Sequence, residues 1–293
     1  MKSIHTTVLL NETIEGLNLK DGATVIDATF GGGGHSKEIC KRYKDIKIVA
    51  IDQDIGAWEK AKDKFKDCDC KVDFVNINFR NLGKVGDKVD GIIFDLGLSS
   101  DQLENSGRGF SFMKLEPLLM TMKENPEPED TTAKEIVNEW SEKSLAEIIY
   151  GYGEEKYRGR IAREIVEARK KKKIETTFDL VGIIERAVPA SYRKGKLHFA
   201  TRTFQALRIA TNDELGALSE GLKKGYEILK SEGRMSVISF HSLEDRIVKN
   251  FFRDKKLEGK AKLINKKPIV AGSEELKINN RARSAKLRIL EKI

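Results

Sequence analysis

The segment from Val25 to Ser36 constrains the fold of this 293-residue chain more than any other. It reads as a short apolar strand ending near Asp27, then four glycines at 31–34, then a helix predicted over about 36–43. Four residues without a Cβ let the backbone approach a ligand closely, and the helix directs its first N–H groups into the turn. Open α/β sheets bind ligands where such a turn follows a strand. The segment therefore predicts an α/β sheet with a nucleotide-sized binding loop. The alternative is a glycine-rich surface turn that binds nothing.

The residues around the glycines indicate which kind of nucleotide cofactor the loop binds. The dinucleotide fingerprint G-x-G-x-x-G is met at Gly31 and Gly33, but its third position is Ser36. Asp27 would gain nothing from a dinucleotide pyrophosphate, whereas a sulfonium cation with an amino-acid tail gains from a nearby carboxylate. The pattern D-x-x-x-G-x-G is typical of S-adenosylmethionine-dependent methyltransferases with a Rossmann-like sheet. A nicotinamide-dependent oxidoreductase is the alternative that shares the glycine loop.

Polar or aromatic residues also follow the next two predicted strands. An acidic residue about 20 positions beyond the glycine turn binds the ribose hydroxyls in this topology. Asp52 suits that contact, and Asp54 suits the N-cap of a helix predicted over 55–65. Phe79 follows the third strand, where an adenine would lie, although a lone Phe is more often part of the core.

A fourth predicted strand delivers Asp95 to the same edge of the sheet, ahead of the turn at 97–100. Methylating an exocyclic amine requires acceptors for its N–H groups and a base for the released proton. The carboxylate of Asp95 suits either task. The alternative is that it caps a turn.

The resemblance to a family becomes specific over longer segments. The matching segments are His5 to Leu10, Thr29 to Gly31, Gly33 to Ser36, Asp95 to Ser100, Arg108 to Phe112, Tyr152 to Glu155, Ala200 to Ile209, Ile238 to Lys249 and Arg281 to Ser284. Together they span nearly the whole chain, which resembles the bacterial 16S ribosomal RNA N4-cytidine methyltransferase family, RsmH (MraW).

The resemblance implies an enzyme that moves a methyl group from S-adenosylmethionine to the N4 of a cytidine in the decoding region of small-subunit rRNA. By matching position, it implies cofactor contacts from Gly33, Gly34, His35, Asp52, Phe79, Asp95 and Gln102, to which the loop itself adds Asp27 and Gly31. The candidate catalytic residues are Asp95, Ser99 and His241. The expected partner is 16S rRNA or the small ribosomal subunit, and the sequence does not specify an oligomeric state.

One segment departs from the family. The family usually reads P-L-D-M-R-M-D, where this chain has Leu119, Thr121 and Lys123 in place of the three charged residues. Cofactor binding is expected to survive, because its contacts lie elsewhere. A retargeted enzyme, or a non-catalytic RNA-binding or ribosome-assembly factor, is the alternative function.

The strand–helix alternation divides the chain in a nested way. We expect a Rossmann-like methyltransferase domain over 1–104 and 203–293, with a mostly helical substrate-recognition domain inserted over 105–202. Helices are predicted over 132–140, 144–150, 154–172 and 178–187 in the insertion, and over 213–230, ended by Gly233, beyond it. Ser, His and Asp at 241–245 are too close in sequence to form a hydrolase triad, and Ser242 with Asp245 predicts the start of a helix.

Positive charge suits a polyanionic partner. Lys and Arg number 54 against 46 acidic residues, a net charge of +8. The candidate substrate-binding residues are Arg108, Arg160, Arg163, Arg202, Arg208 and Arg246. The lysine run at 170–173 alone is more simply a solvated helix end. Because chemistry on a base requires it outside any stack, the pocket is expected to accept an unpaired or flipped cytidine.

The three cysteines, Cys40, Cys68 and Cys70, show no C-x-x-C spacing. They predict reduced thiols in a cytoplasmic protein and no metal site. No signal peptide and no apolar run of membrane-spanning length are expected.

Overall fold

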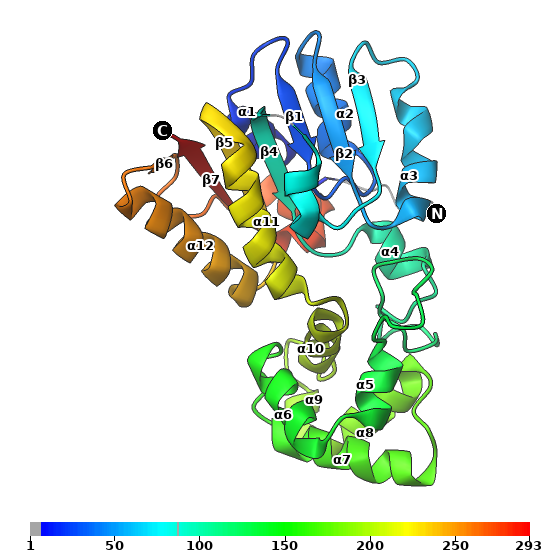
Figure 1. The fold of residues 1–293 in the computed structure, drawn as a ribbon. Helices are drawn as coiled ribbons and strands as arrows, with labels where there is room; N and C mark the ends of the chain where they lie inside the picture. Colours follow the sequence, from blue (N-terminus) through cyan, green and yellow to red (C-terminus); the bar gives the residue numbers. More distant parts are fainter. Residues whose placement is uncertain (1–6, 87) are drawn as a thin grey trace. The chain divides into compact units, whose positions relative to one another are not determined.

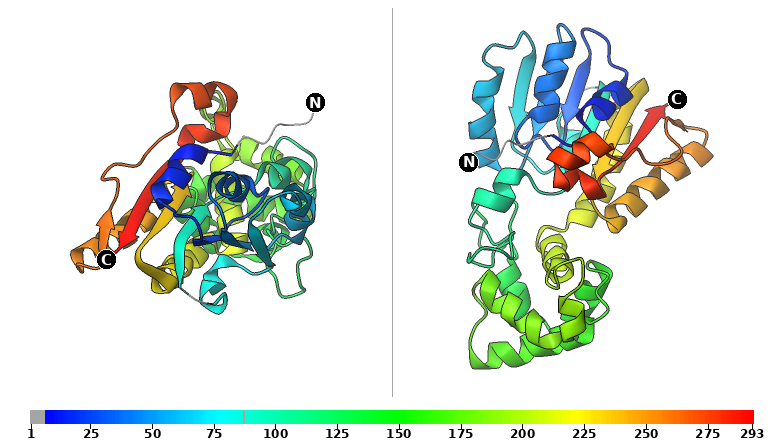
Figure 2. Two further views of the ribbon diagram at one scale, coloured as in Figure 1. Left: turned by 90° about the horizontal axis from the view of Figure 1, so that it is seen from above. Right: turned by 180° about the vertical axis from the view of Figure 1, so that it is seen from behind.

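A computed structural model describes residues 7–86 and 88–293, and these divide into two compact units (Figure 1, Figure 2). One unit comprises Met1–Gly97 and Leu215–Ile293, and the other comprises Leu98–Glu214. His5 and Thr6, which belong to the family resemblance, lie outside the described residues.

The first unit is built on a sheet, which within the described residues has seven strands in the order β3-β2-β1-β4-β5-β7-β6. Its strands are β1 (Thr24–Asp27), β2 (Lys47–Ile51), β3 (Lys71–Val75), β4 (Val89–Asp95), β5 (Leu229–Ser239), β6 (Ala261–Leu263) and β7 (Lys286–Lys292). The first five strands pair in parallel, and β7 lies antiparallel between β5 and β6. This arrangement bears out the predicted Rossmann-like α/β class.

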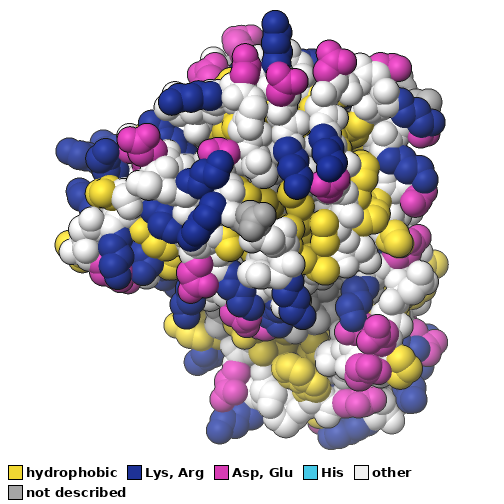
Figure 3. All heavy atoms as spheres, turned by 45° about the horizontal axis from the view of Figure 1, so that its top comes forward, with side chains coloured by type: hydrophobic (Ala, Val, Ile, Leu, Met, Phe, Trp, Pro, Cys, Tyr) yellow, Lys and Arg dark blue, Asp and Glu magenta, His cyan; other side chains and the backbone are white. Residues whose placement is uncertain are grey.

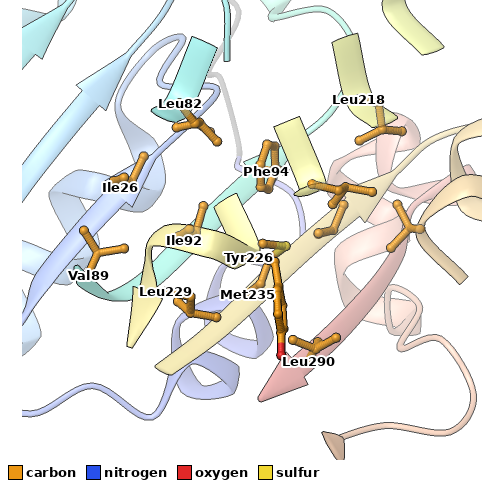
Figure 4. Close-up of a cluster of buried hydrophobic side chains, with 14 of the residues drawn as sticks. Ile26, Leu82, Val89, Ile92, Phe94, Leu218, Tyr226, Leu229, Met235 and Leu290 are labelled. Carbon is orange, nitrogen blue, oxygen red and sulfur yellow. The ribbon is translucent and has the colours of Figure 1, made fainter. Parts of the chain in front are cut away.

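The helices of this unit cover both faces of the sheet. They are α1 (Leu10–Leu17), α2 (Gly34–Arg42), α3 (Ile55–Ala61), α11 (Glu214–Ile228), α12 (Ser242–Leu257) and α13 (Ser273–Ile278), with 3₁₀ turns η1 (Lys62–Phe65), η2 (Phe79–Lys84) and η3 (Asn280–Ser284). Successive residues of a strand point to opposite faces. Ile26 and Ile92 therefore pack with α11 and α12, as Figure 4 shows for part of that cluster, whereas Val25 and Ile93 pack with α1 and α2.

The strand order places the ligand-binding edge. From β1 the chain first builds outward to β2 and β3, and then β4 pairs with the other side of β1. The connections therefore diverge between β1 and β4, where open α/β sheets bind ligands beyond the carboxyl ends of the strands. Asp27 ends β1 and Asp95 ends β4, so both carboxylates lie at this switch point.

The second unit is helical. Its helices are α4 (Ser100–Asn105), α5 (Ala133–Glu139), α6 (Glu142–Gly151), α7 (Arg158–Lys171), α8 (Thr177–Ala187), α9 (Ala190–Arg193) and α10 (Thr201–Asn212). Side chains such as Leu145, Ile161, Ile184 and Leu207 form a separate buried cluster. None of the helices among the described residues of either unit has the length and apolarity of a membrane span.

The observed division between the units differs from the expected positions at 104/105 and 202/203. Residues 98–104 and 203–214 belong with the helical unit. Leu98, Leu103, Phe204 and Leu207 pack in its hydrophobic cluster, which explains why the division moves outward along the chain on both sides.

Two local predictions were wrong, and one helix was not predicted. The helix expected over 55–65 is an α-helix followed by a 3₁₀ turn from Lys62. The helix expected over 213–230 ends at Ile228, and Gly233 lies inside β5. Asp213 has a left-handed φ of 44° and separates α10, which the sequence did not indicate, from α11.

The expectation of three reduced thiols was also wrong. Cys40 on α2 and Cys70, just before β3, form a disulfide with a Cα–Cα distance of 5.6 Å, and Cys68 is free. Parallel pairing of β3 with β2 brings together two residues that are 30 positions apart. Sequence spacing carries no sign of this proximity.

Candidate active site

The glycine loop follows β1 with two glycines in left-handed backbone geometry. Gly31 has φ 48° and Gly33 has φ 70°. A Cβ at Gly33 would lie 2.7 Å from the ring of Phe30 and 3.0 Å from that of Phe65. Gly33 is the N-cap of α2, and no described side chain caps that helix. The first N–H groups of α2 therefore remain available to a ligand in the loop.

Asp27 fixes the helix that follows the loop. It is 2% exposed, its Oδ2 accepts a hydrogen bond from the hydroxyl of Ser36 at 2.7 Å, and its Oδ1 accepts one from the Thr29 amide at 3.4 Å. Burial raises the pKa of Asp27, against the opposing effects of His35 and Ser36. These contacts support the loop from below, and the predicted contact of Asp27 with the cofactor stays a prediction.

Asp52 bridges the ends of β1 and β2. Its Oδ2 accepts from the Gly31 amide at 2.7 Å and its Oδ1 from the Asp54 amide at 2.8 Å. Burial raises the pKa of Asp52 to about 6. A carboxylate has about four lone-pair sites, so two amide contacts leave capacity for ribose hydroxyls. The prediction that Asp54 caps α3 is confirmed, because its carboxylate accepts from the Gly56 amide at 3.1 Å.

Asp95 is held at the end of β4 by two neighbours. Its amide donates to the hydroxyl of Thr29 at 2.6 Å, and its Oδ2 lies 3.4 Å from Nε2 of His35. The Oδ1 atom of Asp95 and both ring nitrogens of His35 are buried and have no hydrogen-bond partner among the described residues. Buried polar atoms of this kind are rare and require an explanation.

Phe79 begins η2, just after the strand β3. Its ring meets that of Phe94 edge-on at 5.6 Å, and a Cβ at Gly221 would lie 2.8 Å from it. The ring is partly buried and packs against the cluster under α11. One side of the Phe79 ring thus packs in the core. The predicted contact of this ring with the adenine stays a prediction.

His241 follows β5, the neighbour of β4 in the sheet, and is the N-cap of α12, which begins at Ser242 as predicted. Its Nδ1 accepts from the Glu244 amide at 3.4 Å, and the Glu244 carboxylate accepts from the amides of Phe240 and His241 at 2.8 and 3.3 Å. The Nε2 atom of His241 lies 3.2 Å from Oε1 of Glu244. A histidine N-cap is uncommon.

Ser99 and Gln102 belong to the helical unit and form a capping box at α4. The Gln102 amide donates to Oγ of Ser99 at 3.1 Å, and the Ser99 amide donates to Oε1 of Gln102 at 3.0 Å. Both side chains therefore stabilise the start of this helix. The catalytic role predicted for Ser99 and the cofactor contact predicted for Gln102 stay predictions.

Arg108 is buried in the helical unit. Its Nη1 donates to the carbonyls of Thr121 and Met122 at 3.1 and 2.7 Å, inside the segment that departs from the family. In that segment Lys123 pairs with Asp130 at 2.7 Å. Arg108 thus holds the backbone of this segment, whereas the sequence predicted an RNA contact.

The remaining predicted substrate residues divide by exposure. Arg160, Arg163 and Arg246 are exposed. Arg208 forms a two-point contact with Glu214 at 2.8 and 2.9 Å, and Arg202 donates to the Glu154 carbonyl at 2.8 Å. On the face shown in Figure 3, Lys and Arg side chains alternate with Asp and Glu side chains.

Two residues that support the loop carried no usable sequence signal. Lys64, on η1, donates to the Gly32 carbonyl at 2.9 Å, and Thr29 holds the Asp95 amide. Both contacts join segments far apart in the sequence. The only sequence signal for these two contacts is the general rule that the carboxyl ends of parallel strands meet at one edge of the sheet.

The residues at this edge fit S-adenosylmethionine. Glycines without Cβ form the loop, Asp52 retains acceptor capacity, and the buried Asp95 and His35 atoms lack partners among the residues that the structure describes. Those residues would hold the cofactor, and its sulfonium methyl group would supply the chemistry.

Comparison with known proteins decides the family. A family model described as the MraW methylase family matches residues 2–293. The chain belongs to this family. A ribosomal RNA small subunit methyltransferase H from Carboxydothermus hydrogenoformans is 48% identical to it, covering 100% of this chain and 99% of the relative. The protein of the same name from Brevibacillus brevis is 44% identical, covering 99% and 98%.

Among solved structures, one from Streptococcus mutans in complex with SAH aligns with a TM-score of 0.48 at 14% identity, covering 98% of this chain and 99% of the other. The predictions of the MraW family, of a methyltransferase and of S-adenosylmethionine as cofactor are confirmed.

Proposed function

We propose that this MraW-family protein methylates the N4 of a cytidine in the decoding region of 16S rRNA, within the cytoplasm. The observation that carries the proposal is Asp95, oriented at the switch point by Thr29 and His35, with a buried oxygen that has no partner among the described residues. Support for the substrate comes from the relatives named ribosomal RNA small subunit methyltransferase H.

The chemistry proposed for Asp95 follows from the electronic structure of cytosine. The lone pair of its exocyclic amine is delocalised into the ring, so an acceptor must hold an N–H as the nitrogen becomes tetrahedral. The Asp95 carboxylate accepts that hydrogen bond and then takes the proton released as the N–C bond forms. His35 stabilises the carboxylate orientation, so that the nitrogen meets the methyl group in line.

The exposed arginines of the helical unit supply the proposed RNA contacts. Arg160 and Arg163 lie on α7, where phosphate contacts would fix the position of the RNA without reading its sequence. The catalytic roles of Ser99 and of His241, and the adenine contact of Phe79, stay separate proposals. Arg108 is buried and Arg208 is paired with Glu214, which favours a structural role for both side chains over an RNA contact.

The test is methyl transfer from labelled S-adenosylmethionine to small ribosomal subunits that lack the modification, with digestion and mass spectrometry of the rRNA. We expect N4-methylcytidine at one position, and a loss of about 10²–10⁴-fold in rate for Asp95→Asn. Asp90→Asn is the matched control, because Asp90 lies on the same strand and binds the Thr24 amide and Lys230. Methylation of another base, or none despite cofactor binding, would favour a retargeted enzyme or an assembly factor.

A further inference from the structure

All three cysteines of the chain lie together where the last turns of α2 approach the start of β3. Cys40 lies on α2, and Cys68 and Cys70 precede β3. Their sulfur atoms lie within 4.8 Å of one another, and all three residues are half-buried. A group of three sulfur atoms from two separate segments is the donor set of a soft-metal site.

The disulfide between Cys40 and Cys70 explains why those two sulfurs are close together. It does not explain why the Cys68 sulfur lies near them. Cys68 is brought back toward them by a turn, in which its amide donates to the Phe65 carbonyl at 3.1 Å. Its thiol makes a long contact, 3.8 Å, with the Lys64 carbonyl. A simple structural disulfide requires no third sulfur at this distance.

We propose that Cys40, Cys68 and Cys70 bind one Zn²⁺ ion when the protein is reduced. Three thiolates occupy three corners of a tetrahedron, and water completes the fourth from the half-exposed side. A Zn–S distance of about 2.3 Å places the sulfurs about 3.8 Å apart. The sulfurs of Cys40 and Cys70 must therefore separate after reduction, and that of Cys68 already lies within 4.8 Å of both. The sequence did not indicate this site, because its cysteine spacing matches no known zinc pattern.

The disulfide and the metal are two exclusive states of the same atoms. A dithiol reductant gives two electrons and two protons to the Cys40–Cys70 bond, which becomes two thiols while the reductant becomes a disulfide. Zinc then displaces the three thiol protons, so its affinity rises with pH. In the oxidised chain only Cys68 remains as a thiol. A single thiolate does not supply enough ligands to hold a zinc ion.

The position of the site connects it to the cofactor loop. The 3₁₀ turn η1 carries Lys64, which donates to the Gly32 carbonyl, and Phe65, which packs beside Gly33. A metal ion would join α2 to the segment directly after η1. The cluster would thereby link α2, which follows the loop, to the turn whose Lys64 and Phe65 contact the loop.

The test uses the full chain, reduced with a phosphine, desalted without oxygen and titrated with Zn²⁺ against a chromophoric chelator. We expect one ion per chain, no binding after oxidation, and for Co²⁺ the charge-transfer absorption of tetrahedral thiolate ligation. Cys68→Ser should weaken binding by more than about 100-fold, since removing a ligand costs at least as much as removing the groups that orient it.

Lys66→Gln is the matched control, because it changes an exposed neighbour and keeps all three sulfurs. Disulfide formation in Cys68→Ser, measured by mass spectrometry, shows whether that variant folds. Equal affinity of wild type and Cys68→Ser, or of the oxidised and reduced chains, would overturn the proposal. If Cys68→Ser fails to fold, the wild-type Co²⁺ spectrum decides, and absence of thiolate charge transfer overturns it. No outcome depends on methyl transfer, so the proposed function is tested separately.

Discussion

Nε2 of His35 lies 3.4 Å from Oδ2 of Asp95, joining the first turn of α2 to the carboxyl end of β4. The side chain of His35 is 4% exposed and that of Asp95 is 24% exposed, so the contact reaches from the interior to the candidate reaction site. This pair of side chains therefore links the helix after the glycine loop to the proposed base.

His35→Asn should lower the rate of methyl transfer by about 10- to 100-fold. The 3.4 Å contact of His35 with Asp95 is not a hydrogen bond in this structure, but catalytic contacts tighten when substrate binds. A hydrogen bond to a charged group then contributes about 1.5–3 kcal/mol, and 1.4 kcal/mol corresponds to a factor of ten. The measurement is kcat and KM in the ribosomal-subunit assay, with cofactor affinity by calorimetry. A change in cofactor affinity with kcat intact would show that His35 serves the cofactor and not Asp95.

Asp52→Asn should change how stability depends on pH. Burial raises the pKa of Asp52 to about 6, so the folded chain binds this proton more tightly than an unfolded chain with a pKa near 3.9. The free energy of unfolding should therefore fall as pH rises from about 4 to 6, by about 3 kcal/mol from this group, and then level off. Urea unfolding of both proteins across this range measures the difference, and parallel curves would contradict it.

Gly33→Ala should destabilise the protein by about 1–3 kcal/mol and weaken cofactor binding. The new Cβ meets the ring of Phe30 at 2.7 Å and the backbone has a φ of 70°. Gly22→Ala is the matched control, because its φ of 77° carries the same strain and a Cβ there meets nothing within 4 Å. Thermal unfolding and calorimetry compare the two, and equal effects would show that the rings beside Gly33 are irrelevant.

Replacing Arg160 and Arg163 by Ala should reduce the salt dependence of RNA binding. Removing a side chain that binds one phosphate lowers the slope of log K against log salt by roughly 0.7–0.9. Arg208→Ala is the control: that side chain is paired with Glu214 and 17% exposed, so stability should fall and the slope should stay. Filter binding at several salt concentrations measures the slope, and an unchanged slope in the double variant would remove α7 from the interface.

The sequence predicts the parts of the site that depend on local chemistry. Glycines after a strand, an acid about 20 residues later and the Asp54 cap are each determined by neighbouring residues, and the structure has the loop and the cap where expected. The contacts of Arg208 with Glu214 and of Cys40 with Cys70 depend on how distant segments pack. No periodicity or spacing reports such contacts, which is why charge alone placed Arg208 among the RNA-binding residues.

The pairing of β4 with β5 has a consequence during synthesis. The whole of residues 96–228, including the helical unit, must leave the ribosome before β5 can join the edge of β4. At about 5–20 residues per second this takes on the order of ten seconds. During that interval β4 is an unprotected sheet edge, which other chains can join. Slowed translation after Asp95 should therefore increase aggregation of the nascent chain, and chaperone binding should be greatest before Leu229 is made.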